Sequence, residues 1–131
     1  MKYLFIIPLM LFFSMYEKDN TSIVGNYKST KESYCNPNMI INIKKNLKTN
    51  NYYFTIYKNK KRIDNGKLTI YTNDNDQRVF GMKKIAGIYT NDSIIIQNSG
   101  NAMNQYTNFE NCNAKYLIFV REQNGSKTCQ K

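Results

Sequence analysis

The feature of this chain that most constrains its fold is a period-two alternation of aromatic and β-branched residues in short segments. It is clearest at residues 52–57, where Tyr52, Phe54 and Ile56 alternate with Tyr53, Thr55 and Tyr57. Successive side chains of a β-strand point to opposite faces, so this alternation predicts a strand with one face on a core. The strand pattern recurs and predicts eight strands, at Ser22–Thr30, Met39–Lys44, Tyr52–Tyr57, Lys67–Thr72, Arg78–Met82, Lys84–Thr90, Ser93–Gln97 and Ala114–Arg121.

Short runs of Asn, Asp and Gly separate the predicted strands and indicate turns. They are Asn50-Asn51, Asp64-Asn65-Gly66, Asn73-Asp74-Asn75-Asp76 and Asn91-Asp92. Because such connections are short, strands that follow one another should pair antiparallel. We therefore expect an all-β fold, a small antiparallel up-and-down β-barrel of about eight strands, whose closure removes exposed sheet edges. A β-sandwich is the alternative.

The segment Gly100–Cys112 departs from this pattern. Met103, Tyr106 and Phe109 follow one another at helical spacing, and Asn101 could cap the first turn. We expect one short helix of two turns before the last strand, lying over one end of the barrel. Its candidate binding residues are Asn101, Met103, Asn104 and Tyr106.

The N-terminus has the layout of a secretory signal. One positive charge, Lys2, precedes the apolar run Tyr3–Phe13, which is followed by the small residue Ser14. The run is shorter than the ~20 residues that cross a bilayer; a buried N-terminal strand is the alternative. We expect a signal peptide at residues 1–19, a single domain at 20–122 and a polar tail at 123–131. The mature protein would then be periplasmic or extracellular, with no transmembrane segment.

Export would place the three cysteines in an oxidising compartment, where disulfides persist. Cys35 and Cys112 lie beside predicted strands, whereas Cys129 lies in the polar tail. We therefore expect a Cys35–Cys112 disulfide, with Cys129 free or intermolecular. The alternative is that all three are reduced thiols.

The chain contains no histidine. This excludes the Ser-His-Asp and Cys-His mechanisms and any metal site that uses imidazole. No carboxylate lies on an apolar strand face, where burial could tune it as an acid or base, and four aspartates fall in predicted turns. We expect a binding protein rather than an enzyme, with no catalytic residue, no metal and no cofactor.

The formal net charge is +10. In an up-and-down barrel alternate connections share one end, and this topology gathers basic loop residues at one of them. They are Lys58, Lys60, Lys61, Arg62, Lys83 and Lys84. Such a surface suits an acidic protein, an anionic glycan or a lipid headgroup, although it could also be a merely solvated face. Only three of the 19 basic residues are Arg, so we do not expect nucleic acid as the partner.

Two further features belong to the first and the last predicted strand. Gly25-Asn26-Tyr27 opens the first strand and Arg121 closes the last. This arrangement resembles that of the lipocalin-like (calycin-type) barrels, in which a Gly-x-Trp motif on the first strand is covered by Arg or Lys from the last. By that resemblance Tyr27, here in place of Trp, is the plug of one barrel end and Arg121 its cover.

The resemblance implies a non-catalytic binding protein that holds a small apolar ligand inside the barrel. The many large residues at alternating positions point instead to a mostly filled interior. The alternative function is an inhibitor or immunity-type protein that docks on an exported partner through basic, Tyr-rich loops.

Overall fold

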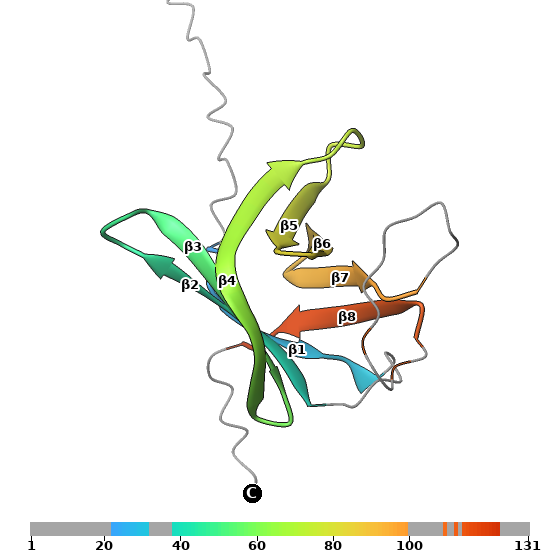
Figure 1. Cartoon of the computed structure of the whole chain (residues 1–131). Coiled ribbons are helices and arrows are strands. Elements are labelled where there is room, and N and C mark those ends of the chain that lie inside the picture. The colour runs from blue at the N-terminus through green and yellow to red at the C-terminus, as the bar shows by residue number, and fades with distance from the viewer. Residues whose placement is uncertain (1–21, 32–37, 100–108, 110–111, 113, 124–131) are drawn as a thin grey trace, which may run out of the picture.

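The computed structural model describes residues 22–31, 38–99, 109, 112 and 114–123. These residues form a closed barrel in which eight antiparallel strands pair in chain order (Figure 1). The strands are β1 (Gly25–Ser29), β2 (Met39–Asn46), β3 (Asn51–Lys58), β4 (Lys61–Thr72), β5 (Arg78–Met82), β6 (Ile85–Thr90), β7 (Ser93–Gln97) and β8 (Tyr116–Arg121). β8 returns to pair with β1, placing Arg121 opposite Tyr27. This confirms the expected all-β barrel and excludes the sandwich.

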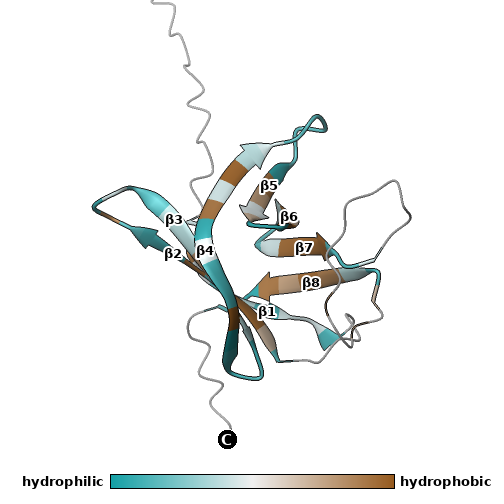
Figure 2. Ribbon diagram, viewed as in Figure 1, coloured by the Kyte–Doolittle hydropathy of each residue, from teal (hydrophilic) through white to brown (hydrophobic). Residues whose placement is uncertain are grey.

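The alternation in the sequence sets the barrel's two faces. Along β2, Met39, Ile41 and Ile43 are buried while the intervening residues are not, and Figure 2 shows the apolar bands this gives the strands. The interior is packed with large side chains that are no more than 1 % exposed. They include Tyr27, Phe54, Phe80, Phe119, Ile56 and Ile94. A small barrel of this kind is filled by its own side chains.

One predicted turn is wrong. Asp64-Asn65-Gly66 lies inside β4, and the chain reverses earlier, at Asn59-Lys60, where both residues have positive φ (49° and 65°). Two positive-φ residues make the tight hairpin turn that matches strand twist. Gly66 faces Phe54 within the strand: a Cβ there would stand 3.1 Å from Lys83 Cε and 3.2 Å from Phe54 Cε1. The aromatic ring takes the room that the glycine leaves.

Several expectations fall outside the described residues. These are the signal peptide, nearly all of the helix expected at Gly100–Cys112, and the tail beyond Gln123. The described residues contain no helix, and so none that is long and apolar enough to cross a membrane.

Candidate functional site

Arg121 covers Tyr27 at the end of the barrel where β1 begins and β8 ends. The guanidinium carbon lies 5.5 Å from the centre of the Tyr27 ring, and Arg121 Nη2 donates to the Tyr27 hydroxyl at 2.9 Å. That hydroxyl donates in turn to the carbonyl of Ile23 at 2.7 Å. The Arg121 stem passes Gly25, its Cγ 3.7 Å from where a Cβ would stand. The structure thus brings Tyr27, Arg121 and Gly25 together at this end of the barrel.

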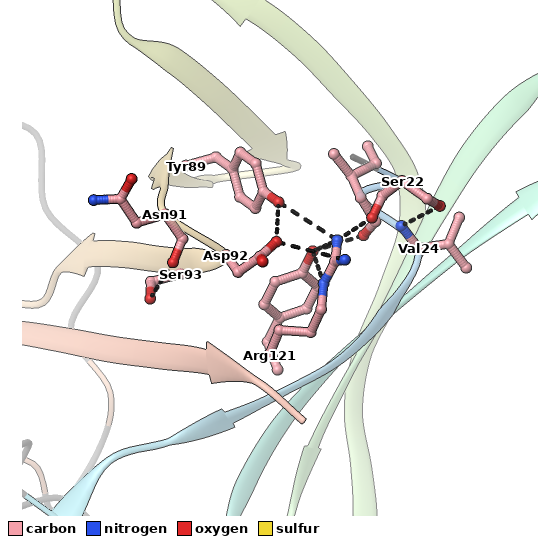
Figure 3. Close-up of polar contacts among 9 residues, drawn as sticks. Ser22, Val24, Tyr89, Asn91, Asp92, Ser93 and Arg121 are labelled. Carbon is pink, nitrogen blue, oxygen red and sulfur yellow. Dashed lines mark hydrogen bonds and ion pairs between the residues drawn. The ribbon is translucent and has the colours of Figure 1, made fainter. Parts of the chain in front are cut away.

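Tyr89 and Asp92 extend this contact across the barrel end (Figure 3). The Tyr89 hydroxyl donates to Asp92 Oδ1 at 2.9 Å, and Arg121 Nη1 lies 3.5 Å from the same oxygen. Burial, followed by the hydrogen bond to Asp92, raises the pKa of Tyr89 above its usual value. Tyr89 therefore stays a protonated donor. The polar atoms of this cluster pair with one another and so connect β1, β8 and the turn between β6 and β7.

The opposite barrel end carries the basic residues predicted from the sequence. Lys60, Lys61, Arg62 and Lys84 are exposed, while Lys58 is half-buried at the end of β3. Lys83 forms an ion pair with Asp64, and this contact holds the pKa of Asp64 below its usual value. Lys83 is therefore partly neutralised and offers less to a partner than its neighbours do.

The register divides this end into two parts. β4 pairs with β5 only from Thr69 to Thr72, whereas its pairing with β3 continues down to Lys61. At ~3.3 Å per residue the β3–β4 hairpin projects roughly 20 Å past the β5–β6 turn. Lys60, Lys61 and Arg62 therefore stand together on a projecting hairpin tip, apart from Lys83 and Lys84.

A groove on the outer wall beside this tip was missed from the sequence. It has a volume of about 590 Å³ and is lined by Lys28, Asn38, Ile40, Tyr57, Asn59 and Lys60. Its members come from β1, β2, β3 and the adjoining turns, and become neighbours only through strand register. No pattern along the chain could have indicated it.

Asn98, which follows β7, was also missed. It is fully buried, and its Nδ2 donates to the carbonyls of Cys112 at 3.0 Å and Ala114 at 2.9 Å, while its Oδ1 accepts from the Phe109 amide at 2.8 Å. It holds the returning chain against the barrel. Nothing in the sequence separates this Asn from the others in so Asn-rich a chain.

Five of the predicted site residues lie in the part of the chain that the structure does not describe. Asn101, Met103, Asn104 and Tyr106 lie outside the described residues, as does Cys35, so the Cys35–Cys112 disulfide stays a prediction. Cys112 itself is 8 % exposed and belongs to the core. Among the described residues no group of three or more Cys, Asp or Glu side chains could hold a metal ion.

No protein family, no curated protein and no solved structure matches this chain.

Proposed function

We propose that this chain is an exported, non-catalytic protein that binds an acidic partner protein through the tip of its β3–β4 hairpin. The observation that carries this proposal is the exposure of Lys60, Lys61 and Arg62 together on a projecting hairpin. The nearest carboxylate along the hairpin, Asp64, is already paired with Lys83. The tip therefore presents a positive field that steers an acidic partner toward it.

The filled interior favours a surface site over a carrier of small apolar molecules. The side chains that point into the barrel, such as Phe54, Phe80 and Phe119, are at most 1 % exposed. The lipocalin-like version of the function needs a hollow barrel, and the packing argues against it.

Apolar side chains among the basic ones favour a protein as the partner over a glycan or a lipid headgroup. Ile63, next to Arg62, is 45 % exposed, and Tyr57 is half-buried beside the turn. Protein interfaces combine such apolar anchors with a charged rim. This observation favours the docking alternative drawn from the sequence, an inhibitor or immunity-type protein.

Charge reversal at the tip tests the proposal. We would immobilise the native protein, a K61E/R62E variant and a K44E/K48E variant, and pass exported proteins of the source organism over each. The K44E/K48E variant is the control. It changes the net charge by the same amount as K61E/R62E does, but on the exposed β2–β3 hairpin at the other end of the barrel. Native protein and control should retain the same acidic proteins at ~50 mM salt and release them at ~300 mM, because screening shortens the range of such contacts.

The K61E/R62E variant should retain about tenfold less of these proteins, the equivalent of ~1.4 kcal/mol. Equal retention by all three proteins would remove the hairpin tip as the site. Equal loss in both variants would show that only net charge matters.

A further inference from the structure

We propose that the groove beside the hairpin tip binds one large apolar side chain of an acidic peptide segment, with its flanking carboxylates paired to Lys28 and Lys60. This inference rests on the proposed function and names the chemistry of the partner segment. The groove lies on the outer wall of β1, β2 and β3, at the same barrel end as the tip.

The floor of the groove is apolar and fixed by register. Lys28 pairs with Ile40, and Ile40 pairs with Tyr57, so the three side chains stand abreast on the outer face of neighbouring strands. Ile40 and Tyr57 are half-buried and line the groove. An isoleucine beside an aromatic ring offers a site for an apolar side chain.

The rim of the groove is polar and held in place. The Asn59 amide donates to the Asn38 carbonyl at 3.2 Å, which ties the β3–β4 turn to the start of β2. The carboxamides of these two asparagines can donate to and accept from a peptide backbone. A rim fixed before binding limits the entropy lost on association.

The charge of the groove selects the ligand. Of the residues that the structure describes, two lysines and no carboxylate line it. An apolar floor with cationic walls disfavours a basic peptide and a purely polar anion, and favours an apolar residue between acidic ones. A volume of about 590 Å³ is within the usual range for sites that enclose a small ligand, ~300–1,000 Å³.

Peptide titration followed by amide NMR shifts tests this assignment. The probes are acetyl-Asp-Glu-Phe-Glu-Asp-amide and the same peptide with Gly in place of Phe, added to the chain lacking residues 1–19. The Phe peptide should bind about tenfold or more tightly than the Gly peptide, because burying the ring removes apolar surface from water. The shifts should centre on Ile40 and Tyr57.

Two variants and two matched controls localise the binding. Y57S should abolish the preference for Phe, while Y53S, on the outer face of the same strand but outside the groove, should keep it. K28E should weaken both peptides about tenfold, the equivalent of ~1.4 kcal/mol, and K67E, on the outer face of β4, should not. K28E is a second, independent test of the groove, and it stays informative if Y57S unfolds the barrel.

The outcomes separate this inference from the proposed function. If K61E/R62E weakens both peptides while Phe and Gly peptides bind equally, the tip binds acidic proteins and the groove assignment is wrong. If the Phe preference holds and K61E/R62E has no effect, the groove is right and the tip is not the docking site. Binding of a heparin tetrasaccharide that displaces both peptides from the groove would overturn the assignment in favour of an anionic glycan.

Discussion

Arg121 and Tyr27 face one another across the strand pair that closes the barrel, and the guanidinium lies over the tyrosine ring. They are register partners of β1 and β8, with the guanidinium carbon 5.5 Å from the ring centre. The same guanidinium donates to the hydroxyl of Tyr27 and contacts Asp92 of the β6–β7 turn. One side chain thus joins the first strand, the last strand and a turn between them.

Loss of this side chain should loosen the closure. Arg121→Met keeps the length of the stem but removes the charge and its hydrogen bonds, and we expect a loss of about 2–3 kcal/mol in the free energy of unfolding, measured by urea denaturation. Arg62→Met, at an exposed position, is the control and should change stability by less than ~0.5 kcal/mol. In a double-mutant cycle with Tyr27→Phe the coupling should be about 1 kcal/mol. Additive effects would show that the two residues act separately.

The sequence predicts best those features of the fold that depend on the pattern of a single strand. The alternation of Phe54 and Ile56 along β3 identifies a strand and its inner face, and short turns then determine the order of strands around the barrel. The turn predicted at Asp64-Asn65-Gly66 was wrong because Asn and Gly are typical of turns, whereas the role of this glycine depends on a residue of another strand. The room it leaves for Phe54 is a tertiary property.

The same distinction applies to the candidate sites. The basic residues were predicted because topology alone places alternate turns at one end. The separation of Lys61 from Lys83 was missed because it depends on how far β4 runs past β5. Lys28, Ile40 and Tyr57 were missed because they are brought together only by the pairing of three strands.

Gly87 on β6 lies where the packed interior has no room for a methyl group. A Cβ there would stand 2.6 Å from Ile94 Cγ2 and 3.2 Å from Ile96 Cγ1. Gly87→Ala should therefore lower the free energy of unfolding by about 1–3 kcal/mol, measured by chemical denaturation. Ile94→Ala alone should cost ~2–4 kcal/mol by leaving a cavity. The double variant should be less destabilised than the sum, since the new methyl group occupies part of that cavity; simple additivity would contradict the close packing.

Asn98 should contribute more to stability than any exposed asparagine. Asn98→Ala leaves two carbonyls and one amide near the end of β7 without their side-chain partner, and we expect a loss of about 2–4 kcal/mol in a thermal or urea melt. Asn65→Ala, at an exposed position of β4, is the comparison and should cost less than ~1 kcal/mol. Equal losses in the two variants would mean that the returning chain is held by other contacts.

The Asp64–Lys83 ion pair should make stability depend on pH at the acidic end. The hydrogen bond from Lys83 lowers the pKa of Asp64 in the folded protein, so the pair stabilises the fold above the unfolded pKa of ~3.9 and this contribution is lost as pH falls through the lower folded value. Both side chains are partly exposed, which limits the effect to about 0.5–1 kcal/mol. The difference in unfolding free energy between native protein and Asp64→Asn should be present at pH 7 and vanish near pH 2. If the difference in unfolding free energy persists at pH 2, it arises from the packing of Asp64 and not from the ion pair.

The topology of the barrel is a further reason to expect the Cys35–Cys112 disulfide. Cys35 belongs to the connection between β1 and β2, and Cys112 to the connection between β7 and β8. Since β1 and β8 are paired neighbours, with the Thr30 amide donating to the Ile118 carbonyl at 2.9 Å, both connections leave the same edge of the same barrel end. Mass mapping of peptides from the unreduced protein should find Cys35 joined to Cys112.

Cys35→Ser should then lower stability by up to ~4–5 kcal/mol, because the bridge closes a long loop in the unfolded chain. Cys129→Ser should leave stability unchanged, and the same melts after reduction should bring native protein and Cys35→Ser together. A Cys112–Cys129 peptide, or a Cys129→Ser variant that loses stability while Cys35→Ser does not, would assign the bridge to the tail instead.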